Sequence, residues 1–293
     1  MNKSDVLFTK EITSENLIKI YQKLGKKLDG KVGVKIHSGE PGGNNFLKPD
    51  FMKDLVKCVN GTIVECNTAY GGKRVRTQEH LKVIDNHGFN KIANVDIMDS
   101  EGEMKLPVKN GKHLDYNYVG SHLANYDSLL VLSHFKGHPM AGYGGALKNI
   151  SIGIASSSGK MWIHTAGRTK KVGNFGVCMF VPQDDFLESM AEAASTIVDY
   201  RPNIVYINVM CNLSVDCDCI SHPAAPKMKD VGILASLDPV AIDQACIDLV
   251  YNSNDSGNKD LMNRIDKKHG IHTIEYAEKL GIGSRKYNLI NID

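Results

Sequence analysis

The sequence lacks any hydrophobic run long enough to cross a membrane. A membrane-spanning helix needs roughly 20 consecutive apolar residues, and no stretch of the 293 residues approaches that length. The N-terminus, MNKSDVLFTKEITSEN, is acidic and polar where a secretory signal peptide would have an apolar core. We therefore expect a cytoplasmic protein that does not work at a membrane.

Charge of one sign is also missing. The formal net charge is +2 at pH 7, and lysine and arginine are scattered along the chain rather than gathered on one helix. Nucleic-acid-binding proteins usually carry a concentrated basic patch. We therefore expect a small-molecule substrate and no nucleic-acid partner.

Internal repeats and low-complexity linkers are absent, and so is an even set of cysteines. Seven cysteines in a cytoplasmic chain of this length do not indicate a disulfide framework. The length fits one large domain, residues 1–293. Two lobes, residues 1–120 and 121–293, with the site between them, are the alternative; the sequence predicts no oligomeric state.

What is present is an alternation of buried strands and amphipathic helices. The patterns predict strands at residues 31–37, 61–66, 91–98, 125–135, 203–210, 230–236 and 287–292. Helices are predicted at residues 50–59, 77–88, 183–200, 237–251 and about 273–279, with Thr77 and Asp238 as N-caps and Gly88 as a helix stop. This alternation predicts an α/β fold with mainly parallel sheets and flanking helices.

Polar loops follow several of the predicted strands. They cover residues 37–45, 67–76, 134–148 and 211–222. Ligands of open α/β sheets bind at the carboxyl ends of the strands. We therefore expect one site to be built from these loops.

The loop after the fourth strand, HFKGHPMAGYGGALKN, is rich in glycine. It is not a Walker A loop, which needs glycine before its lysine and Ser or Thr after it, whereas Leu147 and Asn149 flank Lys148. It matches a dinucleotide fingerprint only loosely, but clustered glycines can still point N–H groups at an anion. A phosphate or nucleotide binder is thus one hypothesis, with cofactor-binding candidates Gly142, Gly144, Gly145, Lys148 and Asn149.

Three histidines, His134, His138 and His164, lie in or near this loop. Neutral imidazole is the commonest metal ligand and the natural base near pH 7. Lys148 lies in an otherwise apolar segment, where a lysine can act as a nucleophile or covalent tether, or simply bind an anion.

The segment MCNLSVDCDCISH concentrates soft ligands. Thiolates suit zinc, Cu(I) and iron–sulfur clusters, but the C-x5-C-x-C spacing of Cys211, Cys217 and Cys219 matches neither a zinc site nor a ferredoxin. A redox or metal-carrier protein with an electron-transfer partner is a second hypothesis. A loop with free thiols is an equally good interpretation.

The segment ECNTAYGGKRVRTQEH places basic residues after the second strand. Lys73, Arg74 and Arg76 could fix a carboxylate or phosphate there. With His37 from the preceding polar loop, Arg74 and Arg76 are the candidate substrate-binding residues, and the expected substrate is a small anionic metabolite.

Five segments within about residues 30–255 carry a family resemblance: VKIHSGEPGGNNFLKP, VECNTAYGGKRVRTQEHLKVIDNHGF, SHFKGHPMAGYGGALKNISIGIASSSGKMWIH, DCDCISH and DVGILASLDPVAIDQACIDLV. They resemble the domain-of-unknown-function family numbered 362, whose members are often labelled iron–sulfur-centre proteins because many carry a ferredoxin-like module. This chain has no C-x2-C-x2-C-x3-C-P run, so the resemblance does not bring an iron–sulfur cluster with it.

The central segment also resembles, more distantly, the lactate racemase family. His138 precedes Lys148 by ten residues and His164 follows it by sixteen, as in that family's motif. The resemblance implies that Lys148 tethers or anchors a nickel-containing cofactor, that His164 ligates the metal, and that His138 moves a proton. Lys73 stands where the family has a second catalytic histidine, so racemase activity is not implied.

The combined expectation is a metal- or cofactor-dependent enzyme, an isomerase or oxidoreductase, that uses nickel, iron or an iron–sulfur cluster. The candidate catalytic residues are His138, Lys148 and Lys73. The candidate metal ligands are His164, His138, Cys217 and Cys219.

Overall fold

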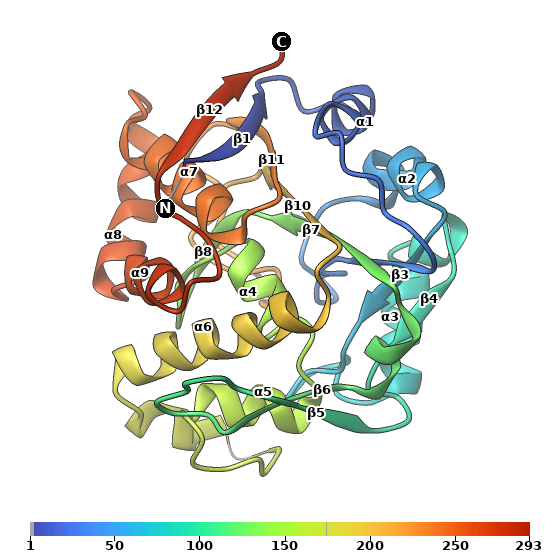
Figure 1. Cartoon of the computed structure of the whole chain (residues 1–293), viewed down its shortest axis with the longest axis vertical. Helices are drawn as coiled ribbons and strands as arrows, with labels where there is room; N and C mark the ends of the chain where they lie inside the picture. The colour runs from blue at the N-terminus through green and yellow to red at the C-terminus, as the bar shows by residue number, and fades with distance from the viewer. Residues whose placement is uncertain (1–2, 174) are drawn as a thin grey trace.

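The computed structural model describes residues 3–173 and 175–293 and is built around one eight-stranded sheet (Figure 1). The strand order is β12-β1-β11-β10-β7-β2-β3-β4. The strands are β1 (Ser4–Thr9), β2 (Val32–Lys35), β3 (Gly61–Glu65), β4 (Val95–Ile97), β7 (Ser128–His134), β10 (Ile204–Met210), β11 (Gly232–Ser236) and β12 (Tyr287–Asn291). Only the two pairings of β11, with β1 and β10, are antiparallel within this sheet. The predicted α/β class with a mainly parallel sheet is confirmed.

Helices cover both faces of this sheet. They are α1 (Ser14–Lys23), α2 (Pro49–Cys58), α3 (Thr77–Asn86), α4 (Ala146–Ile150), α5 (Ser157–His164), α6 (Gln183–Tyr200), α7 (Pro239–Tyr251), α8 (Lys259–Lys267) and α9 (Ile271–Lys279). In the described part of the chain, none of them combines the length and apolar character needed to span a membrane.

The central strand β7 shows why the sheet is covered on both sides. Every residue of it is buried, and successive side chains point to opposite faces. Leu129 and Val131 join the core formed with α4, α6 and α7, whereas Leu130 and Leu132 join the core formed with α1 and α2. A strand buried on both faces is a continuous apolar run in the sequence, and SLLVL has this pattern.

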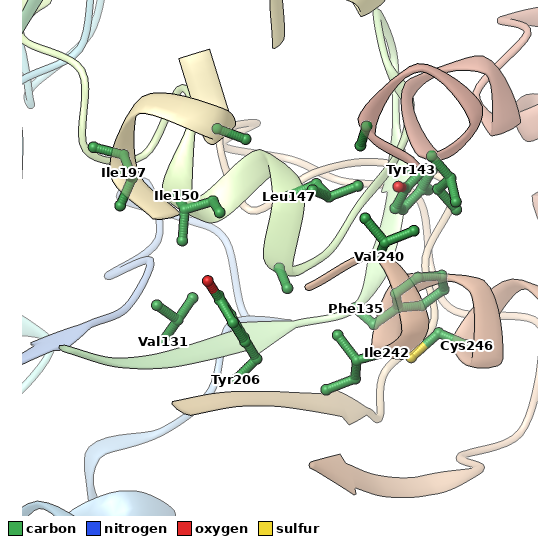
Figure 2. Packing of buried hydrophobic residues seen from close by; sticks show 14 of the residues in the cluster. Val131, Phe135, Tyr143, Leu147, Ile150, Ile197, Tyr206, Val240, Ile242 and Cys246 are labelled. Carbon is green, nitrogen blue, oxygen red and sulfur yellow. The ribbon is translucent and has the colours of Figure 1, made fainter. Parts of the chain in front are cut away.

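The core on the α4 side holds the short helix that carries Lys148. Figure 2 shows Leu147 and Ile150 of α4 packed above Val131 of β7 and Tyr206 of β10. Such contacts fix a helix that, at five residues, would not be stable alone.

Two short antiparallel pairs lie outside the main sheet. One is β5 (Glu103–Pro107) with β6 (Tyr116–Gly120), and the other is β8 (Lys136–His138) with β9 (Gly142–Gly144). The pair β8–β9 follows β7 almost at once. It therefore holds the glycine-rich segment in a defined hairpin beside the end of the sheet.

The sequence predictions of the elements were confirmed in most places and wrong in a few. Asp238 caps α7 by accepting hydrogen bonds from the N–H groups of Val240 and Ala241, at 2.8 and 2.9 Å. Thr77 is not an N-cap: it is the first residue of α3, and its hydroxyl accepts instead from Asn67.

The third predicted strand is shorter than expected. Residues 89–91 form a 3-10 turn, and only Val95–Ile97 pair with β3. The first strand and helix, β1 and α1, were not predicted. β1 pairs in parallel with β12 at the edge of the sheet, so the first and last strands lie side by side, with the two termini at opposite ends of the pair (Figure 1). That contact spans almost the whole sequence and leaves no local signal.

Candidate functional site

A cavity of about 220 Å³ lies at the carboxyl ends of β2, β3 and β7. All four polar loops contribute to its wall, through residues that include His37, Arg74, His138 and Cys219. The remaining wall comes from the ends of the strands, from α4 and α5, and from Ile152, Gly153 and Phe175. The polar loops thus meet at one edge of the sheet, as the strand order of a parallel sheet requires.

Lys148 is placed by the way α4 begins. Asp243 of α7 accepts hydrogen bonds from the N–H groups of Ala146 and Leu147, at 2.8 and 3.0 Å. Burial raises the pKa of Asp243 to about 6, against these bonds. A Cβ atom on Gly145 would lie 2.4 Å from the Asp243 carboxylate, so a glycine is required for this approach. Lys148 follows directly in the same turn of α4 and lines the cavity.

The glycine segment therefore does not present a free phosphate cradle. The first N–H groups of α4 already bind a carboxylate, and Gly142 packs against the backbone of Gly270 rather than lining the cavity. Asn149 donates from Nδ2 to Ser133 Oγ at 3.0 Å and ties α4 to β7. Of the predicted cofactor-binding residues, Gly144, Gly145, Lys148 and Asn149 line the cavity.

The backbone sets the protonation of His138. Its Nδ1 accepts hydrogen bonds from the N–H groups of Met140 and Ala141, at 3.2 and 2.9 Å. A neutral imidazole whose Nδ1 accepts must carry its proton on Nε2. Burial, with the nearby Lys148 ammonium, lowers the pKa of His138 to about 4, so the ring is neutral at pH 7.

His164 has the opposite tautomer. It is the last residue of α5, and its Nδ1 lies 2.7 Å from the carbonyl oxygen of Lys160. A carbonyl can only accept, so Nδ1 carries the proton and the lone pair is on Nε2. Burial lowers the pKa of His164 to about 3. The ring stacks on Phe186 and meets Phe175 at a tilt, with 5.0 and 5.1 Å between ring centres.

Cys217 and Cys219 form a thiol pair beside His138. One ligand atom from each of the three residues lies within 4.8 Å of the others. A hydrogen bond from the Cys219 thiol, the Lys148 ammonium and His138 hold the pKa of Cys217 well below its usual range. The same bond raises the pKa of Cys219. The pair therefore shares one proton, with the thiolate on Cys217.

Asp218 anchors the loop that carries this pair. Its Oδ2 lies 2.9 Å from His134 Nδ1 at the end of β7 and 2.9 Å from Lys136 Nζ on β8. Burial alone would raise the pKa of Asp218, but these two partners hold it well below the usual range. The sequence pointed to His134 as a possible reactive group; in the structure it is part of the anchor.

Cys211 lies apart from the thiol pair. Its sulfur is not among the three grouped ligand atoms, and burial raises its pKa to about 12. The structure thus brings together two of the three cysteines of the proposed soft-metal cluster.

Arg74 is buried in the cavity wall and already holds several partners. Its Nε donates to Glu40 at 2.8 Å, Nη1 reaches Glu65 at 3.5 Å, and Nη2 donates to the Tyr70 hydroxyl at 2.9 Å. Nη2 also lies 3.3 Å from His37 Nε2. Burial and this arginine hold the pKa of His37 well below its usual range, so the imidazole is neutral. Arg74 and His37 thus brace the wall.

Lys73 and Arg76 are not brought into the cavity. Both are exposed, and neither lines the cavity wall. The sequence predicted that all three basic residues lie at the site, whereas the turn before α3 directs only Arg74 into the cavity.

Two buried lysines of the wall were missed by the sequence analysis. Lys35 ends the buried strand β2, and Lys160 lies one helical turn before His164. A signal was present for Lys35, since a charged residue inside the apolar run VGVKI is unusual.

The solved structures that match this chain include two proteins of low sequence identity. The lactate racemase apoprotein from Thermoanaerobacterium thermosaccharolyticum is 15% identical with a TM-score of 0.47, and the match covers 83% of this chain and 56% of that one. A protein of known crystal structure from Thermotoga maritima is 14% identical with a TM-score of 0.42, and the match covers 91% and 58% of the two chains. The chain thus spans less than two thirds of either structure.

Comparison with curated proteins finds no significant match. The family model described as "Domain of unknown function (DUF362)" matches residues 32–248, which include every residue of the cavity wall. Since the match covers most of the sequence, the chain belongs to the DUF362 family.

Proposed function

We propose that the chain is a metal- or cofactor-dependent enzyme that acts on a small anionic metabolite in this cavity. The observation that carries the proposal is the pair of opposite tautomers at His138 and His164. One ring presents a proton on Nε2, and the other presents a lone pair on Nε2. A cavity with both is equipped to hold a metal and to handle a proton.

His164 is the better of the two histidines as a metal ligand. Metal-binding histidines usually donate their second ring N–H to a carbonyl or carboxylate, which fixes the tautomer, and the Lys160 carbonyl does this here. Lys148, whose nearest polar side-chain partner is the Cys217 sulfur at 4.0 Å, is placed to anchor an organic cofactor. A bound transition metal would supply an electron-accepting centre.

His138 is the better of the two as a proton-handling group. The Met140 and Ala141 N–H groups occupy its Nδ1, so the mobile proton is the one on Nε2, which donates to the Cys217 sulfur. The Cys217 sulfur beside it is the acceptor of that hydrogen bond. The two residues thus divide the donor and acceptor roles that general acid–base catalysis requires.

A redox or metal-carrier protein is the second candidate. The grouping of Cys217, Cys219 and His138 within 4.8 Å favours a soft metal ion at the thiol pair. An iron–sulfur cluster held by three cysteines would also need Cys211, which lies outside that group among the described residues.

Metal content and the mass of Lys148 distinguish these functions. Protein purified without oxygen from its native host should contain a transition metal, and peptide mass spectrometry should find additional mass on Lys148. His164→Ala should lose the metal, whereas Cys217→Ser and Cys219→Ser should retain it. His222→Ala, an exposed histidine, is the matched control and should keep the metal content of the unmodified chain.

If the chain is a metal carrier, the effects of these substitutions on metal content should be exchanged. Metal would then be lost from the two serine variants and kept in His164→Ala. Metal-free protein with unmodified Lys148 would contradict the enzyme function.

A further inference from the structure

Two ammonium groups in the cavity wall have no carboxylate partner. Lys35 and Lys160 are 1% and 7% exposed, and neither forms an ion pair within 4.0 Å in the part of the chain that the structure describes. Lys35 Nζ donates to the carbonyl oxygen of its neighbour Ile36, and Lys160 Nζ donates to that of Ala155. Because an ammonium has three N–H donors, each lysine keeps donors free.

Such groups are costly to bury. A buried charge is normally paired, because removing it from water without a partner costs several kcal/mol in order of magnitude. Burial lowers the pKa of Lys35 to about 8 and also lowers the pKa of Lys160. Buried lysines that face a cavity with free donors are arranged to receive an anion.

The other cations of the wall are already engaged. Arg74 binds Glu40 and Glu65, and Lys136 binds Asp218 at 2.9 Å. Lys148 lies beside the Cys217 thiolate. An incoming anion therefore meets free donors at Lys35 and Lys160 rather than at the arginine that the sequence suggested.

We propose that Lys35 and Lys160 together bind the carboxylate group of a small monoanionic organic acid. The inference rests on the proposed function for the use of the cavity by a small anion. Beyond that function, the inference names Lys35 and Lys160 as the residues that bind the anion, and a single negative charge as the charge of the preferred ligand.

The charge balance of this part of the wall favours a monoanion. Lys35, Lys160 and Arg74 are positive, and Glu40, Glu65 and Asp99 are negative, so these cations have no excess charge to offset a second negative charge on a ligand. Of the charged groups around Lys35, the Glu65 carboxylate acts on it most strongly, so a second negative charge on the ligand would be repelled there. Dianionic phosphate should accordingly bind less well than a carboxylate.

The volume of the cavity agrees with a small acid. It measures about 220 Å³, below the roughly 300–1,000 Å³ of pockets that hold drug-sized ligands. A cavity of this size admits a metabolite of a few carbon atoms, and both lysines line it.

Isothermal titration calorimetry of chelator-treated protein at pH 7 tests this site, with acetate and inorganic phosphate as separate probes. We expect acetate to bind at one site per chain and phosphate to bind at least tenfold more weakly. Lys35→Met and Lys160→Met should each weaken acetate binding at least tenfold. Lys82→Met, on the exposed face of α3, should leave it unchanged.

The thermal unfolding temperature of each variant shows whether a loss of acetate binding reflects a loss of the fold. Because methionine fills the space without a buried charge, both cavity variants should unfold at the same or a higher temperature than the unmodified chain. Acetate binding that survives in both variants, or phosphate binding as tight as acetate, would overturn the proposal.

The result of the acetate titration does not depend on whether the protein binds a metal. Acetate binding by chelator-treated protein requires only the lysines, whereas native-host Lys35→Met protein should keep its full metal content. Loss of metal binding with intact acetate binding would remove the proposed function and leave the anion site.

Discussion

His138 and His164 lie on the same cavity but have different chemistry, because different backbone groups meet the same ring atom. N–H groups meet Nδ1 of His138, and a carbonyl meets Nδ1 of His164. Sequence spacing singled out both residues, and the resemblance to a known motif suggested their roles. The tautomers could not be predicted, because they depend on the path of the backbone around each ring.

Replacing His138 should separate proton handling from metal binding. His138→Gln keeps a hydrogen-bonding side chain but has no ring nitrogen to relay a proton. Once a substrate is known, we expect kcat to fall at least a hundredfold, in the range of general acid–base contributions, while the metal content measured by mass spectrometry stays the same. Equal loss of metal in His138→Gln would make this residue a ligand instead.

The charge of Lys35 predicts how anion binding depends on pH. Its pKa is lowered to about 8 by burial, against the attraction of Glu65 and Cys66 and with the repulsion of Lys160 and Arg74. The ammonium is therefore present below about pH 8 and lost as the pH rises through that value. Acetate affinity measured by calorimetry should be constant from pH 6 to 7 and fall above about pH 8.

A bound carboxylate shifts this midpoint upward, because it favours the charged lysine. Affinity that stays constant to pH 10 would show that Lys35 does not bind the anion. In Lys35→Met the decline that follows the Lys35 pKa should be absent, and any decline left in the residual binding belongs to Lys160, whose pKa burial also lowers.

Among the elements, α4 shows how a distant residue controls the site. The glycine-rich hairpin and Lys148 are close in sequence, but Asp243, nearly a hundred residues later, holds the start of the helix. The sequence indicated that Asp238 caps α7, since Pro follows it directly. It gave no sign that Asp243 serves a different helix, because that contact arises only when α7 packs on α4.

Removing the Asp243 carboxylate should loosen α4. In Asp243→Ala the two buried N–H groups of α4, the Asn208 amide and the Tyr143 hydroxyl lose their acceptor, each at a cost of about 1–3 kcal/mol, offset in part by removal of a buried charge. We expect the free energy of unfolding in urea at pH 7 to fall by about 1–4 kcal/mol. Asp248→Ala, on the more exposed side of the same helix, should cost less.

The loop of the thiol pair depends on a similar anchor. Asp218 bonds to β7 and β8 from between the two cysteines. The sequence showed the cysteine cluster clearly but not which cysteines converge. That depends on the anchor, which directs Cys217 and Cys219 toward His138 and leaves Cys211 behind at the end of β10.

At the scale of the whole molecule, the sheet joins strands from both halves of the sequence. β2 pairs with β7 over four residues, and β7 pairs with β10. The alternation of strands and helices was enough to predict the α/β class and the edge of the sheet where the loops meet. The strand order was not predictable, because pairing between distant strands leaves no periodic signal in a single sequence.

This continuity leads us to propose a single domain. The full chain should unfold in one cooperative transition, detected together by circular dichroism and by the fluorescence of Trp162. A fragment of residues 121–293 should not fold, because β7 would lose β2 and expose an apolar edge. Two separate transitions, or a folded fragment, would favour the two lobes instead.

The central claim is that His164 binds a metal in this cavity while His138 does not. Anomalous X-ray scattering from crystals of protein purified without oxygen from its native host tests it most directly. We predict one anomalous peak at bonding distance from Nε2 of His164. A peak held by Cys217, Cys219 and His138, or no peak in the cavity, would contradict the account.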